Sequence, residues 1–138
     1  MKELIAVVLA LALTSPVMAE ILLFSGYNNR VFLGCYDCSK YDSEAICNKY
    51  GTYGSKYSSG SIWNRYGTYG SKYSPSSPWN KYSSSTDVPI MVDRAGKFYG
   101  YFTINVYRSD AFQQSTSLKS LFDTMDGDLE KIRAVICD

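Results

Sequence analysis

The sequence contains no histidine, and this absence narrows the chemistry that the chain can perform. Histidine is the commonest general base and the commonest zinc ligand. Without it, a hydrolase would need a pair of carboxylates such as Asp87 and Asp93, a Ser–Lys pair or a free cysteine. Ser–Lys occurs three times, but always inside a repeated segment, and a catalytic site is needed only once. We therefore expect no catalytic residue, no metal site and no cofactor.

The sequence also lacks a strong excess of charge of either sign. It has 14 Lys and Arg against 13 Asp and Glu, which gives a net charge of +1. Surfaces that bind nucleic acid or an anionic membrane normally need a basic excess. The overall composition therefore predicts no nucleic acid partner.

Long apolar runs are absent after the first residues of the chain. Residues 4–13 are apolar, Lys2 precedes them, and small residues at 17 and 19 stand at the spacing of a cleavage site. This pattern is typical of a secretory signal peptide, and the run is too short to span a bilayer. We expect residues 1–19 to be a signal peptide. Residues 20–138 would then form one secreted or periplasmic domain without membrane insertion.

Four cysteines are present, all after the predicted cleavage site: Cys35, Cys38, Cys47 and Cys137. An even number of cysteines in an exported chain favours two disulfides over redox or zinc chemistry. We favour a local Cys35–Cys38 bond together with a Cys47–Cys137 bond. Pairing of Cys47 with Cys35 or with Cys38 remains open at this point.

The middle of the chain repeats a pattern that is rich in tyrosine and glycine. The pattern Asn-Lys/Arg-Tyr-Gly-Thr-Tyr-Gly-Ser-Lys-Tyr-Ser occupies residues 48–58 and 64–74, and a third copy begins at residue 80, so the period is 64 − 48 = 16. A degenerate copy precedes them, because Ser-Lys-Tyr at 39–41 stands one period before the same triplet at 55–57. A fixed period of this kind is the sequence signature of a repeat architecture, in which each period is one structural unit. Over residues 35–85 we expect about three and a half units, each with one or two helical turns that begin at a Ser cap and end at a glycine.

Short strands are predicted on both sides of the repeat. Residues 21–24 and 30–35 are apolar or alternating, and the asparagines between them suit a tight turn. Residues 88–107 predict a second hairpin. In its second arm the even positions from Phe98 to Val106 would be buried, and the odd positions would face water.

The last segment, residues 115–137, predicts two helices. Its apolar residues recur at three- and four-residue steps, Gly127 divides them, and Asp128 can cap the second helix. The fold class predicted for the whole chain is α+β, as a small disulfide-tied domain.

Tyrosine is abundant, with 13 copies, and the repeat places many of its aromatic residues in register. In one interpretation the rings form the core, because this segment has few aliphatic side chains. In the other they form a platform on which a ligand stacks. We favour the core for Trp63 and Trp79 and leave the tyrosines open. The candidate ligand-binding residues are Tyr50, Tyr53, Tyr57, Tyr66, Tyr69, Tyr73 and Tyr82.

The motifs resemble an uncharacterised module of bacterial exported proteins. The resemblance rests on the repeated NKYGTYGSKY pattern, on Leu33-Gly34-Cys35 before it, on Ile90-Met91-Val92-Asp93 and on Phe98-Tyr-Gly-Tyr-Phe102. It covers residues 32–105, and only Met91 departs from the usual small β-branched residue. The resemblance implies export and architecture, and it supplies no activity and no site residues.

Together these patterns favour a secreted, non-catalytic binding or cell-surface interaction module that contacts a glycan or another protein. Two alternatives remain, a structural or self-assembling exported protein and a hydrolase that uses carboxylates. A role beside a co-encoded partner is a further possibility that one sequence does not test.

Overall fold

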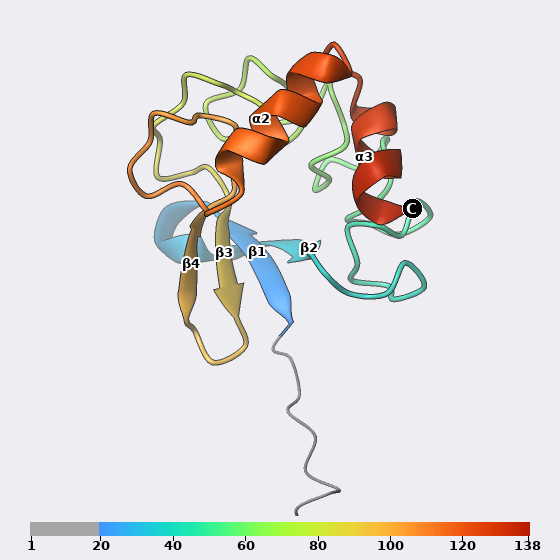
Figure 1. Cartoon of the computed structure of the whole chain (residues 1–138). Helices are drawn as coiled ribbons and strands as arrows, with labels where there is room; N and C mark the ends of the chain where they lie inside the picture. The colour runs from blue at the N-terminus through green and yellow to red at the C-terminus, as the bar shows by residue number, and fades with distance from the viewer. Residues whose placement is uncertain (1–19) are drawn as a thin grey trace, which may run out of the picture.

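The computed structural model describes residues 20–138, and the predicted signal peptide lies outside them. The described chain is an α+β domain, as expected, with a four-stranded antiparallel sheet and two helices. In Figure 1 the strands occupy the lower part of the domain and α2 lies above them, while the turn-rich segment begins beside β2 and continues above the sheet. No helix within residues 20–138 has the length and apolar character that a membrane crossing requires.

The sheet consists of two hairpins placed side by side in the order β2-β1-β3-β4. Its strands are β1 (Ile21–Ser25), β2 (Val31–Cys35), β3 (Ile90–Asp93) and β4 (Phe98–Tyr101). The central strands β1 and β3 pair antiparallel, with Leu23 opposite Met91. The first hairpin turns through a 3-10 helix, η1 (Tyr27–Asn29), where φ is 56° at Asn28 and 54° at Asn29. Asparagine tolerates such positive φ values better than most residues do, so this hairpin is confirmed.

The second hairpin is shorter than predicted, because β4 ends at Tyr101. Beyond it the chain leaves the sheet, and the N–H of Ile104 donates to the carbonyl of Pro78 at 2.9 Å. Thr103 and Asn105 are consequently buried together with Ile104. The predicted alternation of buried even and water-facing odd positions was wrong here on both counts, because it assumed a continuous strand. Thr103 and Asn105 are buried, whereas the even positions Phe98 and Val106 are 50% and 36% exposed.

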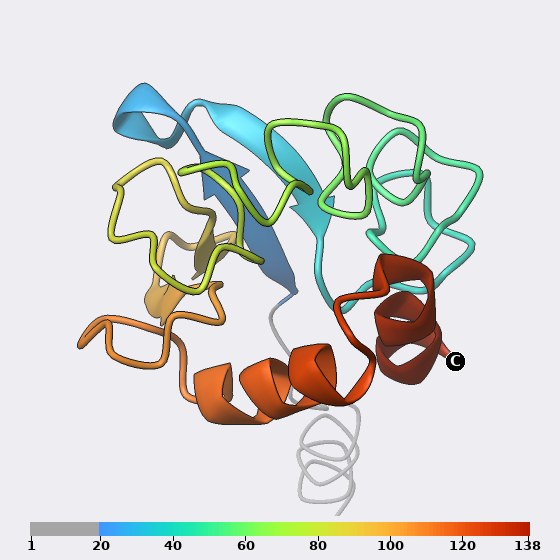
Figure 2. The same ribbon diagram turned by 90° about the horizontal axis from the view of Figure 1, so that it is seen from above.

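Between β2 and β3 the chain forms linked β-turns and no helix. The N–H that closes each turn belongs to the residue whose carbonyl begins the next. From Asn48 to Asn64, the number of residues from the carbonyl that begins a turn to the N–H that closes it is three, four, three, three and three. The same series of spacings leads from Asn64 to Asn80. Each series therefore spans one full period of the sequence pattern. In Figure 2 this segment runs around from the β2 side to the β3 side, while α2 and α3 close the rest of the perimeter.

Side chains at the turn corners explain why the expected helical turns do not form. The first residue of a turn is often Ser or Asn, and its side-chain oxygen accepts the N–H two residues later. Asn48 Oδ1 lies 3.1 Å from the N–H nitrogen of Tyr50, and Ser55 Oγ lies 3.2 Å from that of Tyr57. Such bonds compete with helical hydrogen bonding. The prediction of helices in each unit was wrong because these residues begin successive turns instead of capping helices.

Two tryptophans of the turn-rich segment bond to the backbone of an earlier turn. Nε1 of Trp63 donates to the carbonyl of Ile46 at 2.7 Å, and Nε1 of Trp79 donates to the carbonyl of Ile62 at 2.6 Å. The two indole rings are 5.6 Å apart, and only 2% and 1% of these residues is exposed. Both tryptophans are therefore core residues, as favoured from the sequence, with their one polar atom satisfied.

Two helices complete the core, and both were predicted. They are α2 (Ser115–Thr124) and α3 (Leu129–Cys137). The ring of Phe122 in α2 stacks on Trp79 at 6.0 Å with an interplanar angle of 12°. The side chain of Asp128 accepts the N–H groups of Glu130 and Lys131 and so caps α3.

Both favoured disulfides are present. Cys35 is bonded to Cys38 beside the end of β2, and Cys47 is bonded to Cys137 at the end of α3. The second bond fastens the last helix to the start of the repeat.

The segments 32–46 and 98–112 share a backbone arrangement that we did not predict. Gly34 and Gly100 have φ values of 109° and 114°, and an added Cβ on either would meet backbone atoms within 3 Å. The residue that directly follows each glycine forms a parallel β-bridge to an alanine ten residues further along the chain. The bridges are Cys35–Ala45 and Tyr101–Ala111. The two edges of the sheet are thus covered in the same way, which removes part of their free hydrogen-bonding edge.

Substitution of Gly54 or Gly70 by alanine is expected to lower the free energy of unfolding by at least about 2 kcal/mol. An added Cβ would lie 1.9 Å from the carbonyl oxygen of Asn48 or Asn64, respectively. Gly60→Ala is the matched control, because no heavy atom lies within 4 Å of its Cβ position. Urea unfolding of the three variants measures the difference, and equal midpoints would contradict this account of the turns.

Removal of the Cys47–Cys137 disulfide is expected to cost more stability than removal of Cys35–Cys38. The bonds join residues 90 and 3 positions apart. In the chain-entropy account these loops correspond to about 4 to 5 and about 2 kcal/mol. Urea unfolding of the two double Cys→Ser variants measures both losses, and the reverse order would contradict the prediction.

Candidate binding surface

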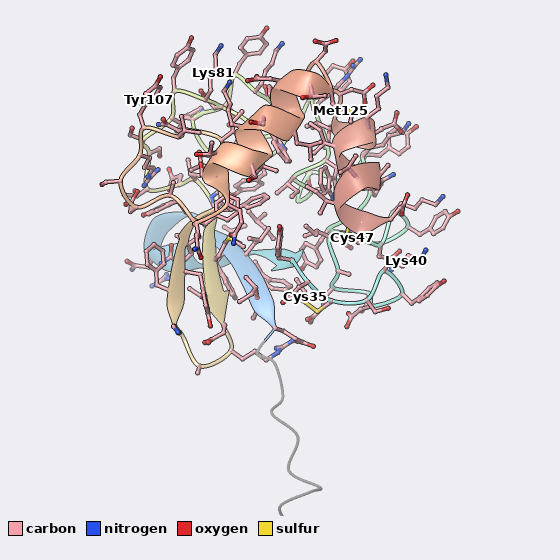
Figure 3. All side chains as sticks on the ribbon, viewed as in Figure 1. Cys35, Lys40, Cys47, Lys81, Tyr107 and Met125 are labelled. Atoms are coloured by element: carbon pink, nitrogen blue, oxygen red, sulfur yellow. A yellow bond between two sulfur atoms is a disulfide. The ribbon has the colours of Figure 1, made fainter. Side chains whose placement is uncertain are left out.

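Seven tyrosines project into solvent from the corners of the turns. Each is the third residue of a turn that begins with Ser or Asn, and that side chain accepts the tyrosine N–H. These residues are between 79% and 93% exposed. Figure 3 shows one of them, Tyr107, pointing outward from its loop. We call the seven the corner tyrosines: Tyr41, Tyr50, Tyr57, Tyr66, Tyr73, Tyr82 and Tyr107.

A basic residue precedes six of the corner tyrosines and lies over the ring. The cation is between 4.8 and 5.6 Å from the ring centroid, which is within the range of a cation–π contact. The six basic residues are Lys40, Lys49, Lys56, Arg65, Lys72 and Lys81. Each corner therefore presents an aromatic ring and a positive charge together.

The structure divides the seven predicted ligand-binding tyrosines into two groups. Five of them, Tyr50, Tyr57, Tyr66, Tyr73 and Tyr82, are corner tyrosines. The other two are half-buried, since the ring of Tyr53 packs edge-on against Phe32 at 4.9 Å and Tyr69 packs against the core. Both of these follow a threonine, whereas the five exposed tyrosines follow Lys or Arg. The residue before the ring is a sequence signal that distinguishes the two groups.

Two corner tyrosines were not among the predicted site residues. Tyr41 belongs to the degenerate copy of the repeat, which the sequence does reveal. Tyr107 has only the Asn-x-Tyr spacing in common with the other corners, and Asn105 Oδ1 accepts its N–H at 3.2 Å. Its corner corresponds to that of Tyr41 in the shared backbone arrangement described above.

The turns themselves do not require an aromatic ring at the corner. Ser76 and Glu44 occupy the same third position in other turns, with their N–H groups accepted by the side chains two residues before them. A large ring that is exposed and has no role in the turn is a candidate binding residue.

Two shallow hollows lie between neighbouring corners. The larger, about 530 Å³, is bordered by Tyr41 and Tyr50 with Lys40 and Lys49. Glu130 and Arg133 of α3 and Asp138, which follows α3, also line it. The smaller, about 290 Å³, lies between Tyr82 and Tyr107 and is completed by Lys81, Ile104, Val106 and Lys119. The larger hollow falls within the usual volume range of small-ligand sites.

The carboxylates proposed for a hydrolase do not form a catalytic pair. Asp93 Oδ1 accepts the N–H groups of Ala95 and Lys97 at 2.9 Å, and its Oδ2 accepts the hydroxyl of Tyr99 at 3.1 Å. The Lys97 N–H bond is the largest of the effects that lower the pKa of the Asp93 carboxyl. Asp87 is exposed and precedes the other end of β3. Asp93 is therefore held ionised within a turn.

The described residues also offer no suitable set of side chains to bind a metal ion. Among residues 20–138, the one close group of potential ligands is Glu20 with Cys35 and Cys38. The two cysteines are joined in a disulfide, so they offer no thiolates to a metal.

Comparisons with known proteins add no information on the fold or on the candidate binding surface. No family model, no curated protein and no solved structure matches the chain. The resemblance to exported bacterial modules stays a prediction.

Acidification is expected to weaken the β3–β4 hairpin through Asp93. Because folding lowers the pKa of this carboxyl, its contribution to stability is complete above the unfolded pKa of about 3.9. That contribution is lost as pH falls through the folded value. The melting-temperature difference between the wild type and Asp93→Asn should therefore shrink between pH 5 and pH 2.5. A difference that stays constant over this range would contradict the prediction.

Proposed function

We propose that residues 20–138 form a secreted, non-catalytic module that binds a polysaccharide through the corner tyrosines. One observation carries this proposal: seven large rings are exposed at positions where the turn itself accepts serine or glutamate. Exposure of so many rings is unfavourable without a partner, and no folding role offsets it.

The chemistry at each corner suits a sugar. A tyrosine ring offers a flat apolar face for the C–H groups of a sugar ring, and its hydroxyl can donate or accept a hydrogen bond. The neighbouring ammonium or guanidinium adds further donors directed outward. Trp63 and Trp79 are buried, so the proposed surface is composed of tyrosine rather than tryptophan.

The disulfides support a location in an oxidising compartment. Two disulfides in a domain of this size are consistent with an extracellular or periplasmic protein, and a glycan ligand at a cell surface would be available there.

We also propose that the repeated sequence unit is a structural repeat that arranges the corner tyrosines in rows. The supporting observations are contacts that recur at the spacing of the sequence period. Nδ2 of Asn48, Asn64 and Asn80 each donates at 3.1 Å to the carbonyl six residues earlier. Together with the two Trp–carbonyl bonds, these contacts would place Tyr41, Tyr57 and Tyr73 in one row and Tyr50, Tyr66 and Tyr82 in a second.

The triple substitution of Tyr50, Tyr66 and Tyr82 by serine is expected to weaken polysaccharide binding at least tenfold, since a loss of about 1.4 kcal/mol produces that change. Serine occupies the same turn position at residue 76, so the fold should persist. Affinity electrophoresis in gels that contain dextran, polygalacturonate or dextran sulfate measures the binding.

Phe98→Ser is the matched control, because this residue is 50% exposed but lies on β4 rather than at a corner. Unchanged binding by a folded triple variant would refute the proposal. Tyrosine-dependent light scattering that rises with protein concentration, without polysaccharide binding, would favour self-assembly instead.

A further inference from the structure

The near-neutral net charge conceals a strong separation of charge along the chain. Residues 45–86 contain five basic residues and no Asp or Glu, so this segment carries +5. Since the whole chain carries +1, the remainder carries 1 − 5 = −4. The total charge, from which we predicted no nucleic acid partner, therefore does not describe the charge of this segment.

All five basic residues of this segment lie at the proposed binding surface. Each directly precedes a corner tyrosine and lies over its ring. Lys56 is paired with Glu130 at 2.7 Å, an interaction that raises the pKa of Lys56. The other four, Lys49, Arg65, Lys72 and Lys81, make no ion pair with any residue between 20 and 138. Their charge is thus available to a ligand.

The smaller hollow brings positive charges and tyrosine rings together at one place. Lys81 and Lys119 border it together with Tyr82 and Tyr107, and no carboxylate lines it. Lys119 also pairs with Asp123 one turn along α2. Figure 3 shows Lys81 and Tyr107 on the same outer side of the domain. An anionic substituent would find a positive charge there beside two rings.

We propose that the ligand of the corner tyrosines is an acidic polysaccharide, a sugar polymer that carries carboxylate or sulfate groups. The rings contact the sugars, and the adjacent cations pair with the anionic groups. This inference rests on the proposed function and specifies its ligand class. An extended polyanion matches cations that are distributed over successive turns, because each sugar unit can bring its own charge to a separate corner.

Single-stranded nucleic acid combines the same two chemistries, stacking and charge. We favour the polysaccharide because the disulfides are consistent with an extracellular or periplasmic location, where acidic glycans are the more available polyanions. The experiment below treats poly(dT) as a competing ligand.

The test compares two variants that lose the same charge at different places. Lys49→Gln/Lys81→Gln removes two corner lysines, and Lys97→Gln/Lys131→Gln removes two exposed lysines outside the repeat. Both variants lower the net charge from +1 to −1. Their affinities for dextran sulfate, polygalacturonate, unmodified dextran and poly(dT) are measured at 50 and 200 mM salt.

We expect the wild type to bind dextran sulfate or polygalacturonate and not to bind unmodified dextran. Its affinity for poly(dT) should be lower than its affinity for the acidic polysaccharide. The corner variant should lose at least tenfold in affinity, the control variant less than threefold, and higher salt should weaken binding.

Tyrosine-dependent binding of dextran at equal strength would overturn the proposal of an acidic ligand while leaving the proposed function intact. Equal losses in the two lysine variants, preference for poly(dT), or no binding to either acidic polymer would also overturn it. If the serine triple variant still binds as the wild type does, the proposed function itself fails.

Discussion

The hydrogen bond from a backbone N–H to the Ser or Asn oxygen two residues earlier is the interaction on which the rest of this structure depends. A single bond of this kind contributes only about 0.5 to 1.5 kcal/mol. Its repetition, however, holds a segment with few aliphatic residues in successive turns. Each bond fixes the third residue of its turn, both where that residue's ring is buried and where it points into solvent. Trp79 is held by Ser77 on the inside, and Tyr82 is held by Asn80 on the outside.

Parts of the fold whose determinants are local could be predicted from the sequence. The two C-terminal helices follow from apolar periodicity, and the cap at Asp128 was foreseen. The turn segment was misjudged because Ser and Asn favour both helix caps and Asx or ST turns. Which use prevails depends on contacts between units, such as the bond from Trp63 to Ile46. Those contacts join residues 17 positions apart and have no signature within a single turn.

The candidate surface shows a similar limit. Register alone placed Tyr53 and Tyr57 in one class, although the first packs on Phe32 and the second is open to solvent. The difference follows from which corner faces the sheet, and this is a tertiary property. Among the seven predicted tyrosines the preceding residue does carry the distinction, since threonine precedes the two inward rings and Lys or Arg precedes the five outward ones. Averaging charge over the whole chain likewise concealed the basic character of residues 45–86, because all acidic residues lie outside that segment.

The ends of the turn-rich segment are attached to opposite edges of the sheet. The N–H of Ile46 donates to Cys35 at the end of β2, and that of Ile104, just beyond β4, donates to Pro78. Strands in a sheet are about 4.8 Å apart, close to the 5.6 Å that separates the two indole rings. Under the proposed structural repeat, successive units would then be spaced much as paired strands are. The distance between the two attachments would limit how many corner tyrosines the proposed polysaccharide could contact.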